Sequence, residues 1–150
     1  MRYALSLLVL AIVSFSGSVR AEDLKPEDTL KAIRNLDLKF SESNEPTRAD
    51  KDLLSFDQAK DEVIWVRTYG DNKITQVYEI VKDRMNVKEG VVIIPLKWVS
   101  MANPGEMNYN PDKHDSGIRV IKKDGKFVCT FYSIDTQGVE ADLTFVEGKE

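Results

Sequence analysis

A tight turn between two strand-like segments constrains the fold of this chain more than any other feature. Residues 117–123 and 126–134 are rich in β-branched and aromatic side chains, and Asp124-Gly125 separates them. Asp-Gly is among the dipeptides that best accommodate the positive φ angles of a two-residue hairpin loop. The pattern therefore predicts an antiparallel β-hairpin and a sheet that contains it.

Further segments on both sides of this hairpin have strand character. Residues 62–69 and 91–99 are rich in Val, Ile and Trp, and residues 139–147 alternate apolar and polar side chains, as half-buried strands do. Pro95 interrupts the second of these segments, which predicts an edge strand or a bulge. Residues 73–82 fit either a strand or a helix, and their β-branched side chains favour a strand.

Residues 26–28 (Pro-Glu-Asp) open the clearest helical pattern in the chain. Proline suits a first helical turn, and the two acids suit the positive end of the helix dipole. Leu30, Ile33 and Leu36 then recur at helical spacing. A second, weaker helical stretch is predicted over residues 48–60. Its apolar face would consist of Leu53, Leu54 and Phe56.

Together these elements predict an α+β fold for a single domain over residues 22–150. One or two N-terminal helices would pack on a curved, mostly antiparallel sheet of five to six strands. The single cysteine, Cys129, lies between Phe127 and Phe131 on one strand face, which predicts a buried, inert thiol. One cysteine and one histidine exclude a disulfide framework and a zinc site built on several thiolates or imidazoles.

Residues 1–21 are predicted to be a secretory signal peptide. Arg2 precedes an apolar run over residues 4–15, and Val19-Arg20-Ala21 places compact residues at the cleavage site. A membrane-spanning helix needs about 20 apolar residues, more than this run supplies. We therefore expect an exported, soluble protein without a membrane attachment after cleavage. It would be periplasmic if the source is a two-membraned bacterium, and otherwise secreted.

Loss of the signal makes the chain more acidic. The full sequence has 21 basic and 25 acidic residues and a net charge of -4; without Arg2 and Arg20, 19 basic residues remain and the net charge is -6. An acidic chain has no electrostatic reason to bind nucleic acid or an anionic surface.

Three segments resemble the NTF2-like superfamily, especially its small exported members. They are the helix opening at residues 26–28, the hairpin at 67–73, and the hairpin at 120–127, where an aromatic residue follows a Gly-Lys turn. The long loop before Gly117 and the strand at 139–147 depart from the family's pattern, and cystatin-like folds have a similar order of elements. The resemblance implies an NTF2-like or cystatin-like roll with a pocket or a dimerising sheet face.

The sequence contains no recognisable catalytic or metal-binding motif, and we expect no cofactor and no metal. Residues 108–112 begin like a calcium loop, but Lys113 and Arg119 occupy the positions that require glycine and glutamate. The loop around residues 103–105 is instead flanked by aromatic and methionine side chains, which are typical of ligand or protein contacts. The candidate binding residues are Trp98, Met101, Met107, Tyr109 and His114.

We therefore expect an exported, non-enzymatic binding protein that engages a small apolar ligand or a protein partner and can form a homodimer through the sheet. Two alternatives stay open. The resemblance suggests an isomerase or dehydratase, for which Glu79, on a strand face with Val77 and Val81, would supply the carboxylate base. The other alternative is an inhibitor or immunity protein that blocks a secreted enzyme.

Overall fold

The computed structural model describes residues 24–44, 49–102, 114–138 and 140–148; the predicted signal peptide lies outside these ranges. In chain order the elements are α1 (Pro26–Ile33), β1 (Leu38–Ser43), β2 (Lys51–Asp57), β3 (Glu62–Tyr69), β4 (Asn72–Ile80), the 3₁₀ turn η1 (Lys82–Arg84), β5 (Asn86–Lys88), β6 (Val91–Ala102), β7 (His114–Lys123), β8 (Lys126–Asp135) and β9 (Glu140–Glu147). Over the described ranges no helix has the length and apolar character needed to cross a membrane.

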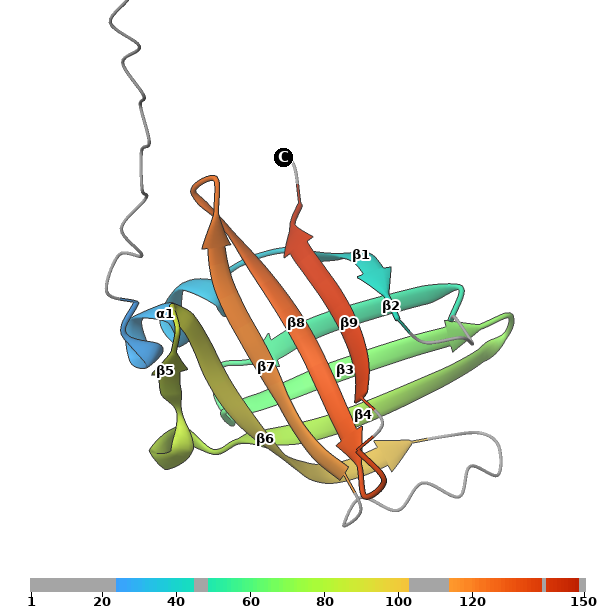
Figure 1. Cartoon of the computed structure of the whole chain (residues 1–150). Helices are drawn as coiled ribbons and strands as arrows, with labels where there is room; N and C mark the ends of the chain where they lie inside the picture. Colours follow the sequence, from blue (N-terminus) through green and yellow to red (C-terminus); the bar gives the residue numbers. More distant parts are fainter. Residues whose placement is uncertain (1–23, 45–48, 103–113, 139, 149–150) are drawn as a thin grey trace, which may run out of the picture.

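Eight of these strands close into one antiparallel β-barrel (Figure 1). Strands β1 to β4 pair in order, β4 pairs with β6, and β6 to β9 continue in order until β9 returns to β1. The short β5 pairs only with the start of β6. Because antiparallel neighbours need only short connections, a succession of hairpins produces this topology.

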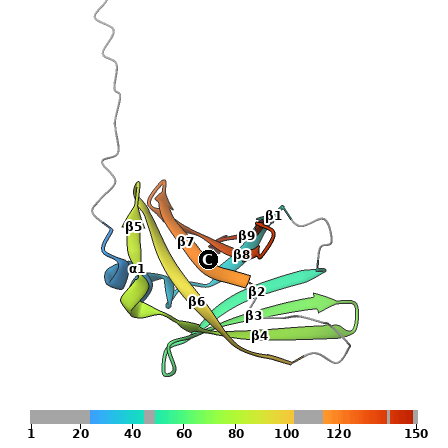
Figure 2. The ribbon, with the colours of Figure 1, turned by 60° about the horizontal axis from the view of Figure 1, so that its bottom comes forward.

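The barrel is flattened into two groups of strands that cross. In Figure 1, β7, β8 and β9 run steeply in front of β2, β3 and β4, and Figure 2 shows the two groups from another side. Strands β1 and β6 connect the groups, and each has a shift of pairing register, between Phe40 and Glu42 in β1 and opposite Val77 and Tyr78 in β6. Such irregularities bend a strand where two sheets meet.

Inward-facing side chains fill the middle of the barrel. Phe131 on β8 contacts Trp65 on β3 and Tyr78 on β4, with ring centroids 4.6 Å and 5.3 Å apart. The interior is therefore a packed core at this level, as in other small eight-stranded barrels. The largest fully buried side chains are Tyr78, Phe131, Phe145, Ile33, Ile94, Ile118, Leu143, Val63, Val92, Val120 and Cys129.

Helix α1 lies at one end of the barrel and contacts β6. Its Leu30 and Ile33 are buried in the core. Asp61, in the turn between β2 and β3, links the helix end and η1 through two ion pairs. Its carboxylate pairs with Arg34 just after the helix and with Lys82 of η1, whose Nζ lies 2.6 Å away. Hydrogen bonds from Lys82 and Arg34 lower the pKa of Asp61 below its ordinary value of 3.8.

Replacing Asp61 by asparagine tests how much these two ion pairs stabilise the fold. Asparagine tolerates the left-handed backbone of this residue (φ 55°), so the substitution removes only the charge. Since the pKa is lowered on folding, the carboxylate stabilises the fold above pH 3.8 and loses that effect as the pH falls through the lowered value. We expect Asp61→Asn to have a lower Tm than the wild type at neutral pH, measured by circular dichroism. A Tm difference that persists undiminished in strong acid would contradict this.

The predicted α+β roll is wrong, because the chain forms a closed β-barrel with one short helix. The second helix predicted over residues 48–60 is strand β2. In this strand Asp52 and Leu54 are 5% and 4% exposed while Leu53 is 43% exposed, which is the two-residue alternation of a strand. The five to six predicted strands become nine because β1, β2 and β5 add to the sheet.

Other predictions from the sequence are confirmed. The β7–β8 hairpin turns at Asp124 and Gly125, whose φ angles of 51° and 78° match the loop geometry that Asp-Gly favours. Residues 73–80 lie in strand β4. Cys129 is fully buried, and this burial raises the pKa of its thiol to about 12, so the thiolate is scarce at neutral pH.

Pro95 lies within β6 rather than on an edge strand. On one side of β6, β5 pairs with residues 91–93 and β4 pairs with residues 96–102, so Pro95 falls between the two partners. Its carbonyl accepts a hydrogen bond from the Val81 N–H at 3.0 Å on that side. The N–H that proline lacks would point the same way, so neither ladder loses a bond there.

Candidate binding site on the inner wall of the barrel

The end of the barrel opposite α1 holds the candidate site. Antiparallel pairing brings the C-terminal ends of β1, β3, β6 and β8 to this end, together with the N-terminal ends of β2, β4, β7 and β9. We call this end the mouth. Strand β6 ends and strand β7 begins at the mouth.

A buried ion pair lies on the inner wall near the mouth. Asp52 on β2 stands opposite Arg67 on β3 in the pairing register. Arg67 Nε donates to Asp52 Oδ1 at 3.0 Å, and the two side chains are 12% and 3% exposed. Trp65 Nε1 donates to the same oxygen at 3.0 Å, and the guanidinium lies 4.5 Å from the Trp65 ring centroid, a cation–π contact.

A second polar group continues along the wall from this pair. Gln76 on β4 stands opposite Trp65 in the register. Its Oε1 accepts a hydrogen bond from the Tyr78 hydroxyl at 2.9 Å, and its Nε2 contacts Met101 Sδ at 3.5 Å. Amide, hydroxyl and ionic groups thus adjoin on β2, β3 and β4. Across the barrel, the hydroxyls of two serines on neighbouring strands approach to 3.4 Å; they are Ser116 and Ser133.

Two of the candidate binding residues predicted from the sequence lie on this wall. Trp98 stands opposite the inward-facing Tyr78 in the β4–β6 register and packs against the core, and Met101 stands opposite Gln76. Both side chains are only partly buried. Of the other predicted residues, Met107 and Tyr109 lie outside the described ranges, and His114 is the first residue of β7, paired with Asp135 in the register.

The ion pair and its neighbours do not stand out in the sequence. Reading residues 48–60 as a helix hid the fact that Asp52 shares a strand face with Leu54. Arg67 alternates with Val63 and Trp65 along β3, so an inward-facing cation could have been inferred from that strand alone. The pairing of the two charges depends on the β2–β3 register, which no local pattern specifies.

The isomerase alternative requires a carboxylate base that faces an apolar pocket. Glu79 is exposed on the outer side of β4, so it does not face an apolar pocket. Asp52 is the buried carboxylate among the described residues, and one of its oxygens already accepts bonds from an indole and a guanidinium. A general base must instead reach a proton on the substrate. In the same parts of the chain no group of three metal-ligating side chains occurs.

Comparison with family models, with curated proteins and with solved structures gave no match. The resemblance to NTF2-like proteins therefore stays an expectation drawn from the sequence. The candidate site rests on the geometry of the inner wall.

Proposed function

We propose that this chain is an exported binding protein that holds a small, mainly apolar molecule at the mouth of the barrel. The observation that carries the proposal is the contrast along the inner wall. Below the mouth, the inward-facing side chains form a buried apolar core. Toward the mouth, partly buried Trp98 and Met101 stand opposite Tyr78 and Gln76 on β4, and the buried Asp52–Arg67 pair lies on β2 and β3. Apolar walls with a few placed polar groups are typical of small-molecule sites.

The energetics of the ion pair support the same proposal. Burying two charges costs several kcal/mol per ion, and apolar residues of similar volume are often as stabilising or more so. A barrel selected only for stability would therefore gain little from Asp52 and Arg67. We propose that the pair is retained because it orients a ligand.

The position of the aromatic core limits the ligand to the mouth. Phe131, Trp65 and Tyr78 are in contact across the middle of the barrel, so a ligand would bind above them. Trp98 and Met101 face inward, where a small molecule reaches them more readily than the surface of a protein partner would. This favours the small molecule over the protein partner and over the inhibitor alternative.

The polar groups favour a ligand with a neutral head group. Asp52 and Arg67 balance each other's charge, and Gln76 and Tyr78 offer an amide and a hydroxyl. A hydroxyl on the ligand can both donate and accept in such surroundings. A charged head group would lose its hydration without gaining a net opposite charge.

Tryptophan fluorescence can test the proposal. Trp65 and Trp98 are the two tryptophans of the sequence, and both face the inner wall. We expect decanol to change the emission saturably, and decanoate and decylammonium to bind at least about tenfold more weakly. Trp98→Phe should lose most of the signal change. All three probes would be used below their micelle-forming concentrations.

Matched substitutions on β6 separate the inner wall from the outer surface. Met101→Ala is expected to weaken decanol binding about tenfold because it removes apolar contact area. Val99, two residues away, is 44% exposed on the outside, so Val99→Ala should bind decanol like the wild type. The absence of a saturable change with every probe would contradict the proposal.

The cellular location belongs to this proposal as well. The predicted signal peptide supports export, to the periplasm if the source has two membranes. Self-association through the sheet, also expected from the sequence, concerns the outer side of the strands and is independent of the inner wall.

A further inference from the structure

The outer side of β2, β3 and β4 carries its side chains in four rows, which we call the four-row face. The rows follow from the pairing registers of the three strands. None of the twelve residues is buried. From the mouth toward α1, the rows are Lys51, Thr68 and Lys73; Leu53, Val66 and Thr75; Ser55, Ile64 and Val77; and Asp57, Glu62 and Glu79.

Charge is segregated along this face. The row at the mouth holds two lysines, the row at the other end holds three acids, and the two rows between them are mainly apolar. Leu53 in the middle is 43% exposed, although leaving a leucine in water forgoes the free energy of burial. An exposed apolar centre between charged borders is the composition of an interaction surface.

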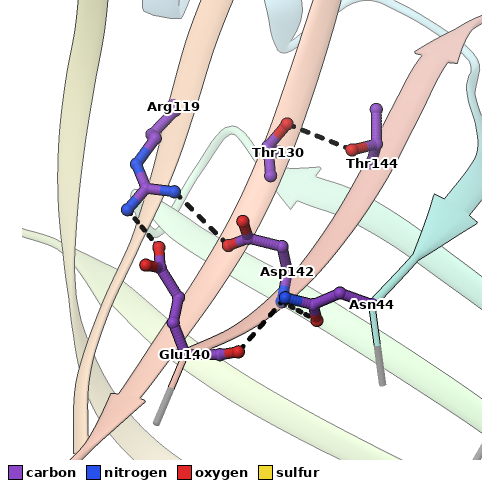
Figure 3. A network of polar contacts seen from close by, with 6 residues as sticks. All are labelled: Asn44, Arg119, Thr130, Glu140, Asp142 and Thr144. Atoms are coloured by element: carbon purple, nitrogen blue, oxygen red, sulfur yellow. Dashed lines mark hydrogen bonds and ion pairs between the residues drawn. The ribbon is translucent and has the colours of Figure 1, made fainter. Parts of the chain in front are cut away.

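The opposite outer side of the barrel has a different arrangement, because a central group of its charges is paired within the chain (Figure 3). Arg119 on β7 binds Glu140 and, at 3.3 Å, Asp142 on β9. Asn44 Oδ1 accepts the Asp142 N–H at 2.8 Å, and its Nδ2 donates to the Glu140 carbonyl at 3.2 Å. The polar groups of this cluster are therefore engaged with one another.

No ion pair between described residues involves the lysines or the acids of the four-row face. Asp57 Oδ1 accepts two backbone N–H groups of the following turn. Lys97 on β6 stands beside Glu79 in the register and offsets part of that charge. The acidic row still presents Asp57 and Glu62 at the end of the four-row face opposite the lysines.

We infer that the four-row face docks on the same face of a second copy of this chain. If the two-fold axis lies between the faces and runs across the strands, each strand faces its own copy in the opposite direction. Lys51 then lies over the partner subunit's Asp57 and Lys73 over the partner subunit's Glu79, while the apolar rows meet in the middle. Such a self-complementary contact is what a two-fold dimer requires.

The same charges exclude the other two-fold arrangement. With the axis parallel to the strands, lysines would face lysines and acids would face acids, which is unfavourable. The face is roughly 20 Å long and 10 Å wide, from the strand spacing and rise. This is well below the ~800 Å² per partner of a standard interface, so we expect a dimer that forms only at high protein concentration and weakens with added salt.

Charge reversal with mixing of variants tests the dimer. Lys51→Glu/Lys73→Glu makes both end rows acidic, and Asp57→Lys/Glu79→Lys makes both end rows basic, since these are the two acids that would lie over the partner subunit's lysines. Each variant alone should associate at least about tenfold more weakly than the wild type, measured by sedimentation equilibrium over an about hundredfold concentration range. An equimolar mixture of the two should form a heterodimer, because unlike rows then meet at both ends.

Two results would overturn this inference: a wild type that stays monomeric into the millimolar range, or variants that associate as the wild type does, alone and mixed. Circular dichroism checks that each variant is folded. The inference goes beyond the proposed ligand binding and fails independently of it, because both variants keep the inner wall and should bind decanol like the wild type.

Discussion

Arg67→Ala is expected to destabilise the barrel by about 3–5 kcal/mol, because it leaves the Asp52 carboxylate buried without its cationic partner. Asp52 is 5% exposed, and after the substitution its Oδ1 atom would still accept the Trp65 indole N–H, a bond of 3.0 Å, but no guanidinium. The substitution also removes the guanidinium from the Trp65 ring. Urea unfolding followed by far-ultraviolet circular dichroism measures the change in the free energy of unfolding.

The double variant Asp52→Leu/Arg67→Leu is the control for this prediction. Removing both charges at once leaves no uncompensated ion, and apolar pairs in such positions are often neutral or stabilising by about 1–4 kcal/mol. We therefore expect the double variant to be at least as stable as the wild type. If Arg67→Ala and the double variant are equally destabilised, the cost comes from lost volume and not from a lone charge.

Phe131→Ala is expected to cost about 3–5 kcal/mol of unfolding free energy, a large part of the ~5–15 kcal/mol of a typical domain. The ring is fully buried and contacts Trp65 and Tyr78 from the opposite group of strands. Its loss opens a cavity between the two groups of strands. Chemical denaturation monitored by circular dichroism provides the measurement.

A substitution on the neighbouring strand provides the comparison for Phe131→Ala. Ile121 on β7 is 37% exposed on the outer side, so Ile121→Ala should change the unfolding free energy by no more than about 0.5 kcal/mol. Comparable losses at positions 121 and 131 would contradict the assignment of inner and outer strand faces.

The sequence predicted strands well where a turn and an alternating pattern coincide. The Asp124-Gly125 hairpin and the alternation over residues 139–147 are of this kind, and both segments form strands in the barrel. Strand β2 was predicted as a helix because its pattern is misleading. An acid, Asp52, occupies an inward position and an apolar residue, Leu53, an outward one, so the three apolar side chains near residue 54 imitate a helical face.

Barrel closure could not be predicted from local patterns. It depends on the pairing of β4 with β6 and of β9 with β1, and β1 and β9 lie about a hundred residues apart. Non-local pairing leaves no mark on the neighbouring sequence. Without closure, the same order of strands and a first helix is compatible with an open sheet covered by helices.

The candidate site was predictable in part. Trp98 and Met101 were identified because aromatic and methionine side chains beside a loop often make contacts, and the structure places both on the inner wall. The polar groups on the same wall could not be predicted, because their contacts with one another depend on the pairing register of the strands. Asp52 and Arg67 are unremarkable surface-type residues until the β2–β3 pairing brings them together inside the barrel.

Decanol binding to the double variant Asp52→Leu/Arg67→Leu tests the central claim most directly. The claim is that the polar groups of the mouth serve binding and not stability. We predict a variant that is as stable as the wild type in urea but binds decanol at least about tenfold more weakly, as measured by tryptophan fluorescence. A folded double variant that binds decanol as tightly as the wild type would contradict the account.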